Sequence, residues 1–203
     1  MTAEIVLLMF DVMYHRIAKY LGPNALTAHS VGFSIITFLE IPASAICLTL
    51  MTVVGQLVGS GNLKEARYQI NRMVIFSCFC LLTTAGIGYL CSDWFAALYH
   101  LSPQSSEYLT DILLIMMIAL PLFWSGSFVT FNGLRAAGDG KFIIVVSIFT
   151  MCILRVGCGY LFAVYFGWGI RGLWSAMALD WLGRMIFFLW RKRGDKWYVN
   201  KLT

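Results

Sequence analysis

The hydrophobic positions of this chain gather in long runs, and the charged positions fall between them. No charged residue occurs between Met73 and Ser92 or between Ile112 and Leu134. Arg155 is the one charge between Phe142 and Ile170. Each run reaches the roughly 20 residues that a helix needs to cross a bilayer. The runs do not alternate apolar and polar residues, so they predict membrane-spanning helices rather than barrel strands.

On this length criterion we expect an all-α, polytopic membrane bundle of about six transmembrane helices. The expected spans are roughly Thr2–Tyr20, His29–Val54, Met73–Leu90, Leu109–Phe131, Phe142–Phe166 and Gly172–Trp190. The first span is the most polar, because it carries both acidic and basic residues. No basic region precedes it, so we expect no cleavable signal peptide; a missing upstream part accounts better for the abrupt start.

Composition agrees with a membrane location. The chain is 60% hydrophobic and 12% charged, and its mean hydropathy is +0.77. Soluble domains are about a quarter charged, and a soluble fold of this size has no room for so much apolar surface. The expected partner of that surface is the lipid bilayer.

Lysine and arginine predict the orientation. They cluster after the second expected span, after the fourth and after the last, in the segments that contain Lys64, Arg67, Arg72, Arg135, Lys141 and Arg191–Arg193. These three segments would share one side, and positive residues favour the cytoplasm. We therefore expect a bundle over residues 1–190, a basic cytoplasmic tail over residues 191–203, and a plasma (inner) membrane location. The net charge of +5 is then explained by the basic segments that set the orientation in the membrane. We expect no nucleic-acid partner.

The residues do not indicate an enzyme or a metal protein. The six cysteines fall in or beside apolar runs, and the three histidines share no ligand spacing. Zinc sites and disulfide frameworks need paired spacings, and no GxSxG, HExxH or Walker A pattern occurs. We expect no metal, no cofactor and no catalytic residue.

Four short segments carry a family resemblance. They read LGPNALTAH from Leu21, GQLVGSGNLKEAR from Gly55, GLRAAGDGK from Gly133 and FGWGIRGLW from Phe166. In this order they resemble the carboxy-terminal half of the multidrug and toxic compound extrusion (MATE) family, along essentially the whole chain. The resemblance implies one six-helix lobe of a twelve-helix transporter, whose amino-terminal lobe is a missing partner from the same gene or a separate chain.

The two cytoplasmic motifs also have a local explanation. Glycine accepts positive φ, so the motif glycines would let a helix end and reverse within a few residues. The motif positions are Gly55, Gln56, Gly59, Gly61, Asn62, Gly133, Arg135, Gly138 and Asp139, with Gly140 beside them. We expect these residues to form turns and to anchor the loops at the headgroups, not to contact a substrate.

Carboxylates inside the spans are the candidates for ion coupling or substrate binding. A charge at the bilayer centre costs at least about 2.5–3.5 kcal/mol, so such a residue usually has a function. Asp11 resembles an acid that some family members carry in the seventh helix, and Glu4 competes with it on roughly the same face. Glu40 lies midway along the second span, two residues before Pro42, where a kink would open a polar pocket. Glu40 paired with Arg155 is the alternative.

The remaining charges in the spans have a structural interpretation. Asp180 and Arg184 are four residues apart, so they can pair on one helix face, and Arg155 belongs to the same group of intramembrane charges. The fourth span carries Met116, Met117, Phe123, Trp124 and Phe128. These side chains would line a cavity for flat organic cations or make ordinary helix and lipid contacts.

The function that these expectations support is secondary active efflux. Cationic or amphipathic compounds would leave the cell in exchange for Na+ or H+, with this chain as a carboxy-terminal half. Two alternatives stay open. One is a related flippase of lipid-linked oligosaccharides, which should lack the two cytoplasmic motifs. The other is a fragment that does not transport.

Overall fold

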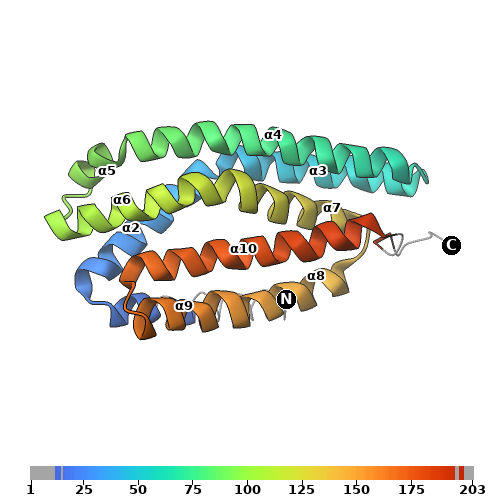
Figure 1. Cartoon of the computed structure of the whole chain (residues 1–203). Helices are drawn as coiled ribbons and strands as arrows, with labels where there is room; N and C mark the ends of the chain where they lie inside the picture. Colours follow the sequence, from blue (N-terminus) through green and yellow to red (C-terminus); the bar gives the residue numbers. More distant parts are fainter. Residues whose placement is uncertain (1–11, 15, 195–196, 199–203) are drawn as a thin grey trace.

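The computed structural model describes residues 12–14, 16–194 and 197–198. The candidates Glu4 and Asp11, and most of the first expected span, lie outside the described residues. Every regular element in the described part is a helix, and the helices lie lengthwise in one bundle (Figure 1).

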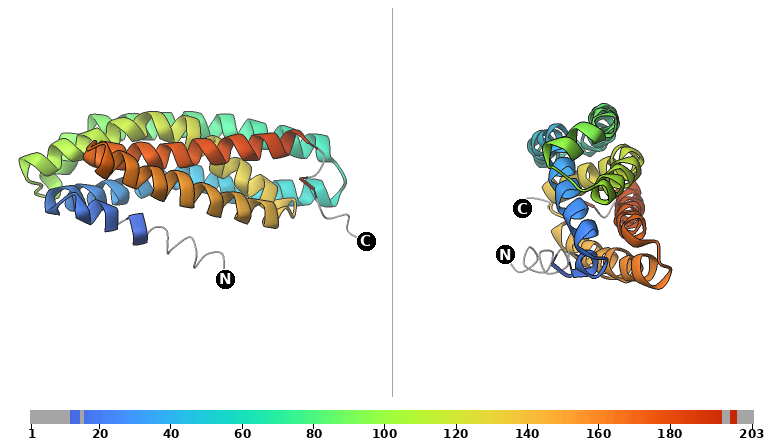
Figure 2. Two further views of the ribbon diagram at one scale, coloured as in Figure 1. Left: turned by 60° about the horizontal axis from the view of Figure 1, so that its bottom comes forward. Right: turned by 90° about the vertical axis from the view of Figure 1, so that its left-hand side faces the viewer.

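The bundle is built from long helical rods. They comprise α2 (Pro23–Leu39) with α3 (Ile41–Gly59); α4 (Leu63–Leu90); α6 (Pro103–Ala119), η1 (Leu120–Val129) and α7 (Thr130–Ala136); α8 (Gly140–Thr150), η2 (Met151–Gly157), α9 (Cys158–Tyr160) and η3 (Leu161–Tyr165); and α10 (Gly169–Arg193). The short α5 (Ser92–Leu98) connects α4 to α6. Both views of Figure 2 place α10 between the rod that contains α6 and the rod that contains α8.

Four described segments are long and apolar enough to cross a bilayer: Ile41–Gly59, Leu63–Leu90, Pro103–Ala136 and Gly140–Tyr165. The helix α10 has the length, with 25 residues, but it carries the charges Asp180 and Arg184 in its middle. Large apolar side chains cover the outside of the rods, as Phe76 and Phe79 of α4 do with 55% and 64% of their surface exposed. A soluble bundle would bury such residues, so the expected all-α, multi-pass membrane bundle is confirmed.

The second expected span bends at Glu40. Pro42 lies in the first turn of α3, where it has no N–H to donate to the preceding turn. The helical bonds around it persist, because the Glu40 amide donates to the Ile36 carbonyl and the Ser44 amide donates to the Glu40 carbonyl, both at 2.9 Å. The bend lets α2 pack against α6 while α3 packs against α4 and α7.

Three stretches of the rods are π-helical rather than α-helical: η1, η2 and η3. The first begins beside Pro121, the residue at which a bend in the helix is to be expected. A π turn holds an extra residue per turn and is common at functional sites. Here η1 and η2 both pack against α10, so the widened turns face the interior of the bundle.

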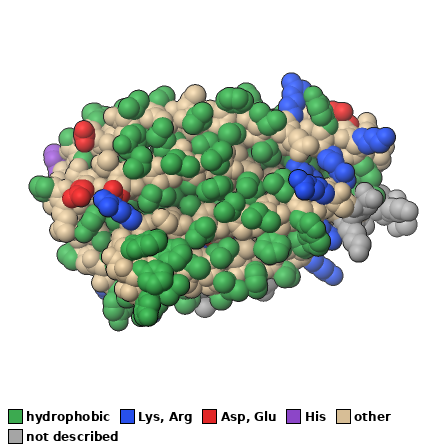
Figure 3. All heavy atoms as spheres, in the orientation of Figure 1, with side chains coloured by type: hydrophobic (Ala, Val, Ile, Leu, Met, Phe, Trp, Pro, Cys, Tyr) green, Lys and Arg blue, Asp and Glu red, His purple; other side chains and the backbone are tan. Residues whose placement is uncertain are grey.

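The charges divide between the two ends of the bundle. The α3–α4 turn, the α7–α8 turn and the end of α10 lie at one end (Figure 1). Lysine and arginine gather at this end in Figure 3, and most of the acidic side chains on that face lie at the other. We call the first the basic end. Which side of the membrane it faces stays a prediction, as does the division between bundle and tail.

Only part of the glycine argument for the motifs is correct. Gly61 and Gly138 have positive φ, of 77° and 91°, and each follows the end of a helix. Gly55, Gly59 and Gly140 lie inside helices or at their ends, without positive φ. Gly133 matters for packing instead, since a Cβ there would come within 2.8 Å of Ile70.

The helix α10 comes close to the backbone of its neighbour at Gly172. A Cβ built at this position would lie 2.7 Å from the carbonyl carbon of Phe162 and 2.9 Å from the amide nitrogen of Ala163. Because these are backbone atoms, no rotamer change can relieve the contact. The absent side chain at Gly172 therefore sets the distance between α10 and η3.

We expect Gly172→Ala to destabilise the chain by about 1–3 kcal/mol, since overpacking forces the backbone to move. Thermal unfolding of the purified chain in detergent measures the effect. Gly55→Ala is the matched control, because it also lies in a helix and a Cβ there meets nothing within 4 Å. Equal melting temperatures for the two variants would contradict the assigned role of Gly172.

Candidate functional site

Asp180 of α10 is the centre of a buried ion cluster. Its Oδ2 lies 2.8 Å from Nη2 of Arg184, one turn along the same helix, and 3.2 Å from Nε of Arg155. Arg184 also donates from Nε to Asp180 Oδ1 at 3.0 Å and to Thr150 Oγ1 at 3.2 Å. The structure thus brings together the three intramembrane charges that were assigned a structural role.

The cluster joins three rods. Arg155 comes from η2 and Thr150 from α8 beside it, while Asp180 and Arg184 come from α10. The Arg184 guanidinium lies 6.0 Å from the ring of Phe128 in η1, a cation–π distance. All three charged side chains are buried. Removing one partner from such a pair leaves an uncompensated buried charge, which makes the cluster a strong constraint on packing.

Glu40 lines a cavity beside this cluster. The cavity measures about 150 Å³, and its wall comprises Phe33, Ile36, Thr37, Glu40, Trp124, Phe128, Arg155, Met177 and Trp181. Glu40 itself lies half-buried at the α2–α3 bend, with the Trp124 side chain as its hydrogen-bonding neighbour and Arg155 as the nearby charge. The kink therefore does position an acid beside a cavity, and the arginine proposed as its alternative partner is shared with Asp180.

A second cavity, of about 240 Å³, adjoins the first. Its lining is Ser44, Cys47, Leu48, Trp124, Phe128 and Asn132, so Trp124 and Phe128 are common to both. These two rings are stacked, with centroids 4.8 Å apart. Both come from the π-helical stretch η1, and Phe128 also faces the Arg184 guanidinium.

The aromatic and methionine candidates of the fourth span separate in the structure. Trp124 and Phe128 line the cavities, whereas Met116 is buried in the core. Sequence reasoning missed Asn132 and Cys47 as lining residues. Asn132 carried one usable signal, a polar amide at helical spacing from Phe128, to whose carbonyl its Nδ2 donates at 2.9 Å. Cys47 carried none, because a small apolar residue suits a helix anywhere.

The motif residues occupy the basic end, away from the cavities. Asn62 caps α4, with its side-chain oxygen accepting from the Glu65 amide at 3.4 Å. Asp139 accepts two hydrogen bonds from Arg191, at 2.6 and 3.1 Å, and so ties the α7–α8 turn to the end of α10. Gln56 and Arg135 are exposed. Neither described cavity beside the ion cluster is lined by a motif residue.

Comparison with known proteins finds transporters. The family model described as MatE matches residues 1–161. The uncharacterized transporter YisQ of Bacillus subtilis is 28% identical over 177 residues, which cover 85% of this chain and 38% of that protein. The probable multidrug resistance protein NorM of Thermotoga maritima is 26% identical over 190 residues, covering 90% of this chain and 40% of that protein.

Solved structures agree in fold. The MATE transporter ClbM in complex with Rb+ superposes with a TM-score of 0.85 at 23% identity, over 94% of this chain and 44% of that one. An outward-facing multidrug resistance MATE family transporter gives a TM-score of 0.84 at 18% identity, over 95% and 44%. At such identities the likeness establishes the fold. The chain spans less than half the length of the relatives it matches.

We expect Asp180→Asn to destabilise the bundle by about 3–5 kcal/mol, because it leaves Arg155 and Arg184 buried without their shared carboxylate. Thermal unfolding in detergent is the measurement. The control is Asp111→Asn, whose ion pair with Arg171 at 2.6 Å involves an exposed arginine side chain and should cost about 0–1 kcal/mol. Similar losses from both substitutions would show that the buried cluster does not hold the rods together.

Proposed function

The chain belongs to the MatE family, and on that premise we propose that it is the carboxy-terminal lobe of a secondary active efflux antiporter. The family consists of transporters, so the chain is not an enzyme. Cationic or amphipathic compounds would move outward while Na+ or H+ moves inward. The missing partner is an amino-terminal lobe, supplied by the same gene or by a separate chain.

One observation carries this proposal: an acidic side chain and a stacked aromatic pair line adjoining cavities midway along the rods. Glu40 provides the negative charge, and Trp124 and Phe128 provide two π faces. A carboxylate beside aromatic faces attracts an organic cation by charge and by cation–π interaction together. A purely structural bundle has no need of an acid at this position, where a charge is costly to insert.

Exchange follows from competition at the carboxylate. When a proton or Na+ neutralises Glu40, the site loses its attraction for the substrate cation, and the substrate is released. When the coupling ion leaves, the site regains that attraction. If the two states face opposite sides of the membrane, this competition drives exchange by alternating access. Transporters built from repeats usually hold such sites near the midplane, between their halves.

The arginine beside Glu40 also has an acidic partner in the ion cluster. Arg155 lines the same cavity as Glu40, but its Nε is 3.2 Å from Asp180 Oδ2. Asp180 forms ion pairs with both Arg155 and Arg184, so these arginines have an acidic partner other than Glu40.

Asp11 is the second proposed coupling residue. The nearest described residues favour it, since Tyr14 is buried and its ring lies 5.8 Å from the Arg155 guanidinium. The Tyr14 hydroxyl donates to the Leu173 carbonyl of α10. Tyr14, three residues after Asp11 in the sequence, thus contacts both the ion cluster and α10. Glu4 remains the third candidate.

The proposed orientation places the basic end in the cytoplasm, with the protein in the plasma (inner) membrane. The α3–α4 turn, the α7–α8 turn and the end of α10 lie at that end (Figure 1), and lysine and arginine gather there (Figure 3). The positive-inside rule favours the cytoplasm for such segments.

We expect Glu40→Gln to abolish exchange while leaving the protein in the membrane. The amide keeps the shape of the side chain but carries no negative charge that a coupling ion could neutralise. The assay is efflux of a fluorescent organic cation from cells, driven by a pH or Na+ gradient. Cells express the chain with its complementary lobe, in one polypeptide or as two. A fall of at least about tenfold is expected, equal to about 1.4 kcal/mol of coupling.

Glu65→Gln is the matched control, since Glu65 lies at the basic end, where it accepts from Gln69 at 2.7 Å. It should transport normally. Asp11→Asn in the same assay tests the second candidate. Undiminished efflux in both the Glu40 and Asp11 variants would exclude these carboxylates as the coupling site. A chain that gives no efflux with any complementary lobe would overturn the transport proposal itself.

A further inference from the structure

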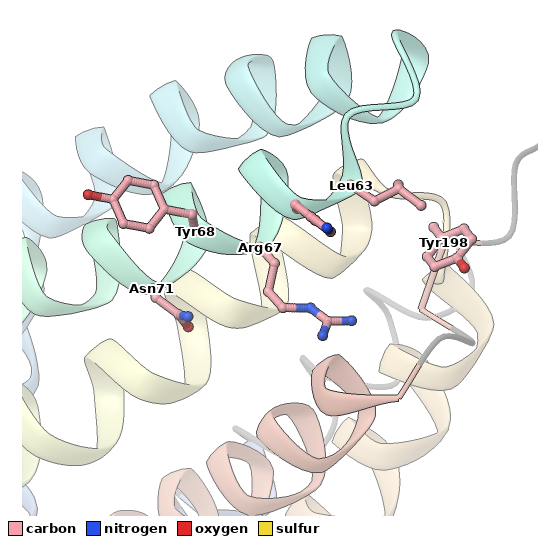
Figure 4. Close-up of a pocket in the computed structure, with 6 residues that line it drawn as sticks. Leu63, Arg67, Tyr68, Asn71 and Tyr198 are labelled. Atoms are coloured by element: carbon pink, nitrogen blue, oxygen red, sulfur yellow. The ribbon is translucent and has the colours of Figure 1, made fainter.

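A further pocket lies at the basic end, away from the cavities of the proposed transport site. It measures about 410 Å³ and is lined by Leu63, Lys64, Arg67, Tyr68, Asn71 and Tyr198. Figure 4 shows its walls: one face of the start of α4, and Tyr198 from the segment after α10. Five of the six lining residues belong to a single helical stripe, with Lys64, Arg67 and Asn71 at spacings of three and four.

Positive charge dominates this pocket. Lys64 and Arg67 line it, and no acidic residue does so among the residues that the structure describes. Glu65, between them in sequence, turns aside to accept a hydrogen bond from Gln69. The first turn of the 28-residue helix α4 adds the positive end of its dipole. An anion would therefore find two cationic side chains and the positive end of the helix dipole on the same side.

The buried end of α10 adds a third cation. Lys192 is only 5% exposed, and its Nζ donates to Oδ1 of the lining residue Asn71 at 2.6 Å. Burial, together with the charges of Arg67 and Arg193, lowers the pKa of Lys192 to about 8. Among the described residues, the groups that act on Lys192 are two cations and the Asn71 amide, so an anion would stabilise the positive charges gathered there.

Contacts with residues that follow α10 hold the Arg67 side chain in position. Its Nη2 donates to the Gly194 carbonyl at 3.2 Å, and its guanidinium lies 5.9 Å from the ring of Trp197, which is fully buried. These contacts hold the guanidinium beside the pocket that it lines. An arginine pre-positioned in this way loses little side-chain entropy when it binds a phosphate.

We propose that this pocket binds the phosphate group of an anionic phospholipid, with Arg67 and Lys64 as the phosphate ligands. The pocket lies where the apolar surface of the bundle meets its basic end, which is the depth of the headgroups. Leu63 and the exposed Tyr68 offer apolar contact for the glycerol and the first acyl carbons. Basic pockets at the ends of transmembrane helices recognise such headgroups by charge and shape.

The inference is independent of transport. It gives the basic residues of the first cytoplasmic motif a task beyond topology. A bound headgroup would connect the start of α4 to the end of α10, two segments that Arg67 and Lys192 already bring together.

The experiment uses the whole chain, purified in a neutral detergent, with native mass spectrometry to count and titrate bound lipid. The probes are dioctanoyl phosphatidylglycerol, dioctanoyl phosphatidylcholine and inorganic phosphate. We expect one phosphatidylglycerol per chain, bound at least about tenfold more tightly than phosphatidylcholine. Arg67→Gln should weaken phosphatidylglycerol binding by about tenfold, because it removes a charge-assisted phosphate contact.

Arg72→Gln is the matched control. It removes the same charge from an exposed position on the same helix, outside the pocket lining, and should change the affinity by less than about twofold, because exposed charges at a distance are screened. Since Arg67 also holds Gly194, Lys64→Gln provides a second variant at an exposed side chain. It should weaken binding by about threefold, because a flexible lysine makes a weaker contact than a pre-positioned arginine.

Three results would overturn the proposal. Equal binding of the two lipids would show that charge is not recognised. Equal loss in the Arg67 and Arg72 variants would indicate general attraction to a basic surface. Inorganic phosphate that binds as tightly as phosphatidylglycerol, with the same loss in Arg67→Gln, would assign the pocket to a free anion instead of a lipid.

Discussion

The arrangement of the rods depends on one buried carboxylate. Asp180 is fully buried, and it forms ion pairs with Arg184 on its own helix and with Arg155 on the neighbouring rod. In the interior of a membrane bundle there is no water to solvate a lone charge, so these three side chains must meet one another. Their meeting sets the rotation of α10 about its axis and its position along η2. The hydrophobic effect does not specify this geometry, since lipid is as apolar as the helix surfaces.

The cavities follow from that constraint and from two irregularities of the backbone. Pro42 bends the second rod at Glu40, and the π-helical stretch η1, which begins beside Pro121, turns Trp124 and Phe128 toward the acid. A straight α-helix would present different side chains at these positions, because each π turn shifts the register of the residues after it. The proposed transport site therefore depends on places where the helices depart from regular α-helical geometry. In the ion cluster beside it, Asp180 pairs with both arginines.

Much of this could be expected from the sequence. The charge-free runs predicted the rods, and the spacing of Asp180 and Arg184 predicted their pairing, because both arguments use only distances along one helix. The ion pair of Arg155 with Asp180 could not be predicted, because it depends on how two helices pack, and the sequence suggested only Glu40 as a partner of Arg155. The glycine argument failed at Gly133 for the same reason. Its neighbour is Ile70 of another helix, and no local preference reveals that contact.

The amino-acid sequence by itself determined the membrane environment, the helical class, the grouping of the basic segments and the family. These properties are local or additive: hydropathy sums along a run, and a motif is a string of letters. The tertiary structure alone decided which charges meet, which aromatic rings face Glu40, and that the start of α4 and the end of α10 enclose a basic pocket. These are contacts between residues far apart in the chain, and they depend on how helices rotate and bend when they pack.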